Sequence, residues 1–277
     1  MSIKKMEEMT WKEFERLDKD KTVVIVGLSP IEEHGPHLPL GTDFIAANDC
    51  LSEVVKYLEK RNSKFNYILH PPFPIGYNES IINFPGTMFY RTITIENLLI
   101  DFGASISRSG INKMVIINHH LDLGHIKAIE NAREHLLDKF NIKLLEVASR
   151  MIYSDENHKD SIQKEEDNQR EIHADIRETS FMLYKHPQLV KDCYKDLEPV
   201  YLDMKKFIMS GEKCFRENGI IEGYIGSPGN ATFEYGEKQF QDMITQTGTL
   251  ILKFLKGEAI PEISSVIKAA MNHIEWR

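Results

Sequence analysis

Short apolar runs alternate with longer amphipathic stretches over most of the chain. Apolar, β-branched runs of this kind are typical of buried parallel strands, and they lie at Thr22–Gly27, Tyr67–His70, Lys113–Asn118 and Lys143–Ala148. Helical periodicity predicts helices at Trp11–Asp18, Asp43–Arg61, Thr94–Ser109, Ile126–Phe140, Ala174–Tyr184 and Glu234–Lys256. This alternation predicts βαβ units, and therefore an α/β fold: a layered α/β/α domain with a mostly parallel central sheet.

The segments between these elements are rich in polar residues, proline and glycine. Residues 28–42 and 71–87 are expected to be long loops, because proline and glycine interrupt them repeatedly. Residues 155–170 are almost entirely charged or polar, which predicts a surface excursion. A short tail is expected from Ala259 onward. No repeat or linker divides the chain, so residues 1–277 are predicted to form a single domain.

The charge balance narrows the choice of partners. The 277 residues include 34 lysines and arginines and 42 aspartates and glutamates, a net charge of −8. This balance argues against nucleic-acid and membrane binding, which favour a basic surface, and leaves a small-molecule substrate. No apolar run is long enough to span a bilayer, and the N-terminus lacks the apolar stretch of a signal peptide. Three widely spaced cysteines fit a reducing compartment, so a cytoplasmic location is expected.

Two polar clusters follow two of the predicted strands, where ligands bind in open α/β sheets. The first contains Glu32, His34 and Asp43, and the second contains His120 and Asp122. Residues two apart in an extended segment point the same way, so each cluster offers imidazole and carboxylate to one volume. Asp43 could return to that volume as a bridging carboxylate. These ligands suit Zn²⁺, Mn²⁺ or Fe²⁺, and five of them suit two ions about 3.5–4 Å apart. Hydrogen-bonded structural histidines are the competing interpretation.

A third cluster, which includes His173, Asp175 and Glu178, lies near a predicted helix start. Five residues along a helix correspond to about 500° of rotation. His173 and Glu178 would therefore not share a face unless the helix begins between them. The alternative is a helix N-terminus whose acidic residues are favoured by the helix dipole. Spacing by itself leaves both interpretations open.

Four segments resemble motifs of the creatininase (creatinine amidohydrolase) family. Residues 32–43, EEHGPHLPLGTD, closely resemble the family signature E-Q-H-G-P-H-L-P-x-G-T-D. Residues 83–87, NFPGT, resemble its F-P-G-T loop, and residues 173–180, HADIRETS, resemble its H-A-G-x-x-E-T-S motif. Residues 226–236 resemble its G-D-P-x-x-A-T…G segment. The matches follow the family order, and the chain is identified as a member of this family.

The resemblance implies a metal-dependent hydrolase with an α/β/α fold that assembles as a homohexamer. Asp122 occupies the position of a ligating glutamate in creatininase itself. Glu178 matches a glutamate beside the metals that is a ligand in some members, and His173 matches the catalytic histidine. Four further residues match the metal ligands of the family, with the aspartate bridging: Glu32, His34, Asp43 and His120.

Several positions depart from the family pattern. His119 and Asp175 each stand where the family has glycine, and Ile81 stands where a histidine is expected. Creatininase covers its flat substrate with tryptophans, whereas residues 155–170 contain no aromatic residue. A substrate other than creatinine is therefore expected.

Together these observations predict a dinuclear hydrolase that cleaves a cyclic or linear amide C–N bond with metal-activated water. Zn²⁺ is the expected metal, with Mn²⁺ or Fe²⁺ as alternatives. His173 would protonate the leaving nitrogen, and Glu178 would steer the water or hold a metal. One alternative is hydrolysis of a related small substrate, either the formamide of a nucleotide precursor or the ring of a keto-inositol. Another is a non-catalytic metal-binding accessory protein with the same fold.

Overall fold

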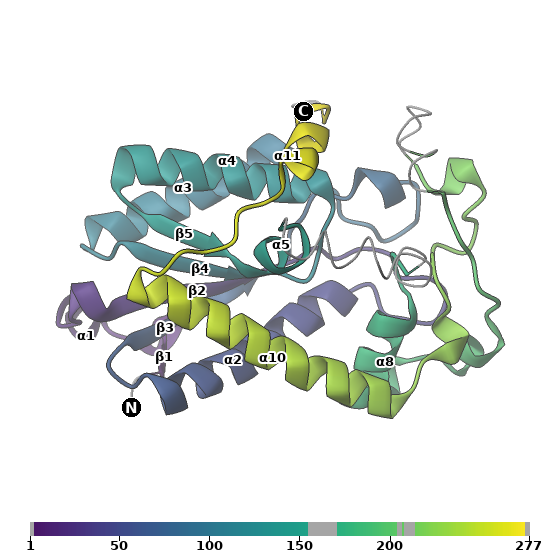
Figure 1. Cartoon of the computed structure of the whole chain (residues 1–277), viewed down its shortest axis with the longest axis horizontal. Helices are drawn as coiled ribbons and strands as arrows, with labels where there is room; N and C mark the ends of the chain where they lie inside the picture. The colour runs from purple at the N-terminus through teal and green to yellow at the C-terminus, as the bar shows by residue number, and fades with distance from the viewer. Residues whose placement is uncertain (1–2, 155–170, 204–206, 208–213, 275–277) are drawn as a thin grey trace.

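The computed structural model describes residues 3–154, 171–203, 207 and 214–274, and it has the predicted α/β architecture. The sheet in this part of the chain has five strands: β1 (Ile3–Lys5), β2 (Thr22–Leu28), β3 (Asn66–Phe73), β4 (Lys113–Ile117) and β5 (Lys143–Glu146). They lie in the order β1-β3-β2-β4-β5, and every neighbouring pair is parallel (Figure 1). The carboxyl ends of β2 and β4 therefore lie side by side.

Helices cover both faces of the sheet, which confirms the layered α/β/α prediction. One face carries α2 (Thr42–Arg61) and α10 (Phe233–Lys256), and the other carries α3 (Thr92–Arg108) and α4 (Leu123–Phe140) (Figure 1). Every residue of β2 is buried, as expected for a central strand covered on both sides.

The two apolar cores follow from the alternation of side chains along the strands. In β2, Val23 and Ile25 belong to the core beneath α2 and α10, whereas Val24 and Val26 belong to the core beneath α3 and α4. The sheet is thereby packed between two layers of helices. The loops that follow β2 and β4 begin at its carboxyl edge.

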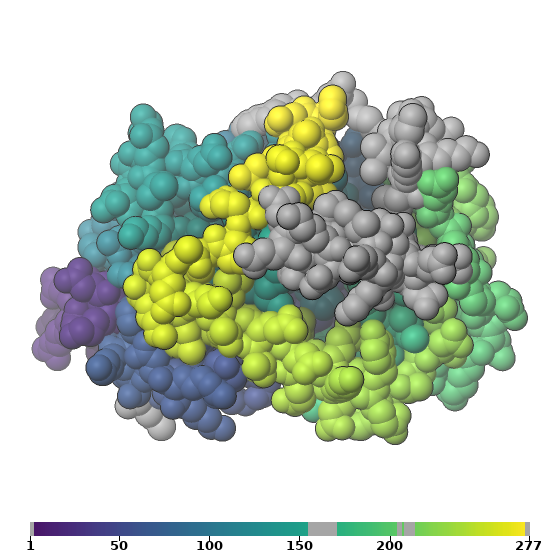
Figure 2. All heavy atoms as spheres, viewed as in Figure 1, coloured from purple at the N-terminus to yellow at the C-terminus, as the bar shows by residue number. Residues whose placement is uncertain are grey.

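Shorter helices complete the described chain: α1 (Trp11–Glu15), α5 (Val147–Ile152), α8 (Ile176–Lys185) and α11 (Ser265–Asn272). Figure 2 shows the segment after α10, in yellow, running from the α10 layer toward the α3–α4 layer, where α11 contacts α4. Ile263 and Met271 of this segment are buried in the α3–α4 core. No helix in the described ranges has the length and apolar character needed to cross a bilayer.

The elements that differ from the sequence predictions have local physical causes. β1 is a three-residue edge strand that contains two lysines, so it shows no apolar run. β3 continues through Pro71 and Pro72, which the sequence assigned to a loop, and its pairing with β2 shifts register between Val26 and Leu28. Such an irregularity accommodates prolines, which cannot donate to a ladder. α5 and α11 were not predicted, and the expected excursion at 155–170 lies outside the described residues.

A close helix contact sets the position of α8. A Cβ atom on Gly236 of α10 would overlap the backbone carbonyl oxygen of Ser180 in α8, which cannot rotate away. We therefore expect Gly236→Ala to lower the free energy of unfolding by about 1–3 kcal/mol through overpacking, measured by chemical denaturation. Glu237→Ala, at the exposed neighbouring position, is the control and should change it by less than about 0.5 kcal/mol. Equal stability of Gly236→Ala and the wild type would contradict this contact.

Candidate metal centre

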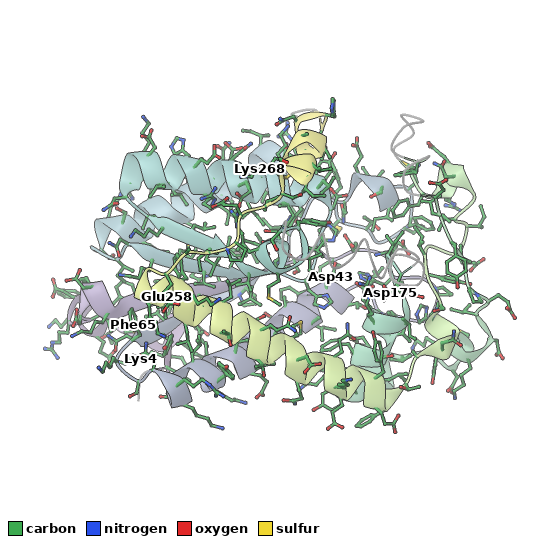
Figure 3. The ribbon with its side chains drawn as sticks, in the orientation of Figure 1. Lys4, Asp43, Phe65, Asp175, Glu258 and Lys268 are labelled. Carbon is green, nitrogen blue, oxygen red and sulfur yellow. The ribbon has the colours of Figure 1, made fainter. Side chains whose placement is uncertain are left out.

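Three segments that are distant in sequence meet at the carboxyl edge of the sheet. Glu32 and His34 lie in the loop after β2, Asp43 lies in the first turn of α2, and His120 follows β4. Figure 3 shows Asp43 at this end of the sheet, with Asp175, which precedes α8, at the same end. The adjacency of β2 and β4 brings the loop after β2 and the segment after β4 together, and the start of α2 returns Asp43 to them.

The first group of potential metal ligands consists of Glu32, Asp43 and His120. The Nδ1 atom of His120 lies 3.3 Å from Glu32 Oε1 and 3.2 Å from Asp43 Oδ2. All three residues are buried. One imidazole and two carboxylates that converge in this way form a donor set suited to a divalent ion.

The second group consists of His34, Asp43 and Glu178. The Nε2 atom of His34 lies 3.4 Å from Asp43 Oδ1 and 3.8 Å from Glu178 Oε2. Asp43 therefore presents one carboxylate oxygen to each group: Oδ2 to the first and Oδ1 to the second. A carboxylate shared in this manner is the arrangement that bridges two metal ions.

In the imidazoles of His34 and His120, a backbone hydrogen bond uses one nitrogen. The nitrogen that faces the carboxylates is left available to a metal. His34 Nδ1 donates to the backbone carbonyl of Glu32 over 3.1 Å, and His120 Nε2 donates to the carbonyl of Tyr77 over 2.7 Å. A carbonyl can only accept, so these nitrogens carry the protons. His34 Nε2 and His120 Nδ1 are left as lone-pair donors that face the carboxylates. Backbone partners of this kind orient metal-bound histidines.

Two atoms of the potential ligands are buried with no hydrogen-bond partner among the described residues: Glu32 Oε1 and His34 Nε2. Buried polar atoms in folded proteins are nearly always paired. The other oxygen of Glu32 accepts a hydrogen bond from Asn78 Nδ2 over 2.9 Å, which aims Oε1 at His120. The residues therefore fit a pair of divalent ions, which would satisfy both atoms.

The electrostatics of the centre favour bound positive charge. Burial by itself would lower the pKa of the His34 imidazole, but the carboxylates of Asp43, Glu178 and Glu32 outweigh burial and raise it to about 10. Burial acts to raise the pKa of Asp43, yet the surrounding histidines hold it well below its usual value. A cation, either a proton or a metal ion, is therefore stabilised between these groups, and a metal must displace the proton to bind.

Asp122, which the sequence predicts as a ligand, caps a helix near the centre. Its Oδ1 accepts a hydrogen bond from the backbone N–H of Gly124 over 2.7 Å and caps α4. Its Oδ2 accepts from Ser80 Oγ over 3.3 Å. Burial raises the pKa of this carboxyl to about 6. Asp122 belongs to none of the ligand groups found among the described residues, whereas Glu178 belongs to one.

The start of α8 explains how His173 and Glu178 come together. The helix begins at Ile176, between the two residues, so His173 lies in extended chain and Glu178 in the first turn. Glu178 Oε2 accepts a hydrogen bond from the backbone N–H of Ala174 over 2.6 Å. Ala174 adopts a left-handed backbone with φ of 47°, which turns the chain sharply between the two side chains. The helix had been expected to start two residues earlier, at Ala174.

His173 is paired with a carboxylate that is not itself in a ligand group. Its Nε2 lies 2.9 Å from the backbone oxygen of Glu33 and 3.2 Å from Glu33 Oε1, so Nε2 carries a proton that it donates to this residue. Burial and the nearby His34 act to lower the pKa of His173, but Glu33 and Glu178 outweigh them and raise it to about 9. His173 also belongs to a third ligand group with Glu32 and His34.

Sequence reasoning did not identify all residues of the centre. Asn78, which holds Glu32, lies in the predicted loop 71–87, where no periodicity marks it. His119, which stands where the family has glycine, lies with Nδ1 3.4 Å from Asp43 Oδ1. His37 bonds Thr179 Oγ1 through Nε2 over 2.8 Å, and burial lowers its pKa to about 4.

The α/β/α fold carries, at the carboxyl edge of its sheet, groups of residues that could hold metal ions and that share one carboxylate. Residues 7–251 match the family model described as Creatininase, creatinine amidohydrolase. The chain belongs to the creatininase family and is an amidohydrolase.

Known relatives agree with this assignment. The chain is 28% identical over 225 residues to the mycofactocin precursor peptide peptidase of Mycolicibacterium smegmatis, covering 80% of this chain and 81% of the relative. A solved creatininase titled as its Mn form matches with a TM-score of 0.68 and 19% identity, covering 91% of this chain and 98% of that one. A mutant creatininase of Zn–Zn type matches with a TM-score of 0.66 and 18% identity over the same shares. At this identity the two structures support the fold.

Proposed function

We propose that this protein is a dinuclear metal-dependent hydrolase that cleaves the amide C–N bond of a small molecule or a peptide. The observation that carries this proposal is the position of Asp43. Its two carboxylate oxygens face separate groups of ligands, one with Glu32 and His120 and the other with His34 and Glu178. An accessory protein that bound a single structural metal would not need such a shared carboxylate.

In this proposal Glu32, Asp43 and His120 hold one ion, and His34, Asp43 and Glu178 hold the other. Glu178 completes the second position in preference to Asp122, because Glu178 groups with His34 and Asp43, whereas Asp122 belongs to no ligand group among the described residues. The mixture of imidazole and carboxylate suits Zn²⁺ first, with Mn²⁺ or Fe²⁺ as alternatives. Solved creatininases with manganese and with zinc support these two metals as candidates.

The bound ions would supply activation of water and polarisation of the amide carbonyl. The residues of the chain supply the rest. His173 donates a proton from Nδ1 to the leaving nitrogen, while its Nε2–H remains with Glu33. The carboxylate of Glu33 stabilises the imidazolium before the transfer and fixes the ring. A positioned general acid of this kind contributes about 10²–10⁴-fold to the rate.

A linear amide fits this chain better than creatinine. Trp11 lies in α1, at the end of the molecule opposite α8 (Figure 1), and Trp276 lies outside the described residues. The chain therefore offers no described tryptophan to cover a flat ring at the centre. The peptidase of Mycolicibacterium smegmatis, named for action on a precursor peptide, supports a peptide amide.

Metal analysis combined with a substrate panel tests the proposal. We expect about two zinc, manganese or iron ions per chain. Chelation should abolish hydrolysis, and the matching metal should restore it. The panel contains dipeptides and tripeptides, each as the free acid and as the C-terminal amide, with formamides, lactams and creatinine beside them. Hydrolysis that survives chelation would contradict the proposal, and a metallated protein that cleaves no amide would favour the accessory role. Cleavage of formamides alone would favour the deformylase alternative.

Other features implied by the resemblance or expected from the composition remain predictions. They are a single domain over residues 1–277, a homohexameric assembly and a cytoplasmic location.

A further inference from the structure

Arg177 is held in a fixed orientation at the start of α8. Its Nε and Nη2 atoms donate to Asp175 Oδ2 over 2.8 and 2.6 Å, and Nη2 also donates to the backbone oxygen of Glu171 over 2.6 Å. Asp175 is fully buried, and its other oxygen accepts the backbone N–H groups of Arg177 and Glu178. The same carboxylate thus caps the helix and grips the guanidinium.

The outer edge of this guanidinium is open. Nη1 has no hydrogen-bond partner among the described residues, and 40% of the Arg177 side chain is exposed. A guanidinium has five N–H donors in a planar fork. Asp175 and Glu171 occupy one edge, so the edge that carries Nη1 remains available to an acceptor from outside the chain.

The start of α8 links this arginine to the metal centre. Arg177 directly precedes the proposed ligand Glu178, and the two charges act on each other. Arg177 also acts on the phenol of Tyr153, whose hydroxyl donates to the carbonyl of Leu121 over 2.7 Å, next to His120. The guanidinium therefore lies close enough to Glu178 and Tyr153 for their charges to interact, and Tyr153 is bonded to the loop after β4 that carries His120.

We propose that Arg177 binds a carboxylate of the substrate, so that the preferred substrates are amides with a free carboxylate near the scissile bond. Asp175 acts as a positioning residue that fixes the orientation of the guanidinium. A monoanionic carboxylate is favoured over a doubly charged phosphate, because the nearby carboxylates of Glu171, Asp175 and Glu178 repel the larger charge more strongly. This inference rests on the proposed amide hydrolysis and specifies the substrate class for it.

The test compares each panel peptide as the free acid with its C-terminal amide. The wild type should hydrolyse the free acid with a kcat/KM about 10- to 100-fold higher, the range of one charge-assisted hydrogen-bonded contact. Arg177→Gln should remove this preference by raising KM for the acid, with kcat nearly unchanged. Arg177→Lys keeps the positive charge but lacks the planar fork of the guanidinium, so this variant should retain part of the preference for the free acid. Asp175→Asn, which preserves a good helix cap, should weaken the preference as well.

Arg91→Gln is the matched control, since Arg91 is an exposed arginine before α3 and should leave the preference intact. Calorimetric binding of N-acetylalanine and of its amide to the metal-loaded wild type and Arg177→Gln proteins gives a readout independent of turnover. Equal use of acid and amide by the wild type, or an equal loss with both substrates in Arg177→Gln, would overturn the inference. If the protein hydrolyses amides without preferring the free acid, this inference fails and the proposed function stands. If it hydrolyses no amide, the proposed function itself fails.

Discussion

Replacement of Asp43 with asparagine should remove metal from both positions at once. Asparagine keeps the shape of the side chain but offers one neutral oxygen, so it cannot bridge as a carboxylate does. We expect the metal content to fall from about two per chain toward zero. Amide hydrolysis should fall by about 10³-fold or more, because water would lose the pKa decrease from 15.7 toward about 7. Metal analysis and initial rates on the same preparation measure both quantities.

Asp49→Asn is the control for this change. Asp49 lies on the same helix and pairs with His186 Nε2 over 2.7 Å, away from the ligand groups. This variant should retain both the metal and the activity. If Asp43→Asn kept two ions per chain, the bridging role would be refuted, and the remaining ligands would have to account for the site.

Replacement of His173 with glutamine should separate metal binding from catalysis. We expect kcat to fall by about 10²–10⁴-fold, the contribution of a general acid, while the metal content stays unchanged. The physical reason is that His173 keeps the proton on Nε2, which it donates in a hydrogen bond to Glu33, and can exchange the proton on Nδ1. Glutamine retains a hydrogen-bond donor for Glu33 but cannot deliver a proton to a leaving nitrogen.

A second histidine near α8 provides the comparison. His186 follows the last residue of α8 and bonds Asp49, so His186→Gln should leave kcat within a few-fold of the wild type. Loss of metal in His173→Gln would instead assign His173 to the ligand group that it forms with Glu32 and His34. An unchanged kcat would eliminate it as the proton donor.

The helix and strand pattern was recoverable from the sequence wherever burial was extensive. β2 and β4 are covered on both faces, so they appear as continuous apolar runs, and the long helices bury one stripe each. β1 was not predicted because it is short, lies at the edge of the sheet and is stabilised by pairing with β3. The strand character of Pro71 and Pro72 was likewise invisible, because a register shift in the neighbouring strand accommodates them.

The sequence by itself determined the chemistry available to this protein. Imidazole and carboxylate pairs after two buried strands indicated a metal site, because residues two apart in extended chain share a direction and parallel strands end at one edge. Only the tertiary structure could show which carboxylates converge. The start of α8 at Ile176 brings Glu178 to His34, whereas capping of α4 occupies Asp122. The contacts of Glu33 with His173 and of Asn78 with Glu32 join residues 140 and 46 positions apart, and no local pattern encodes separations of that length.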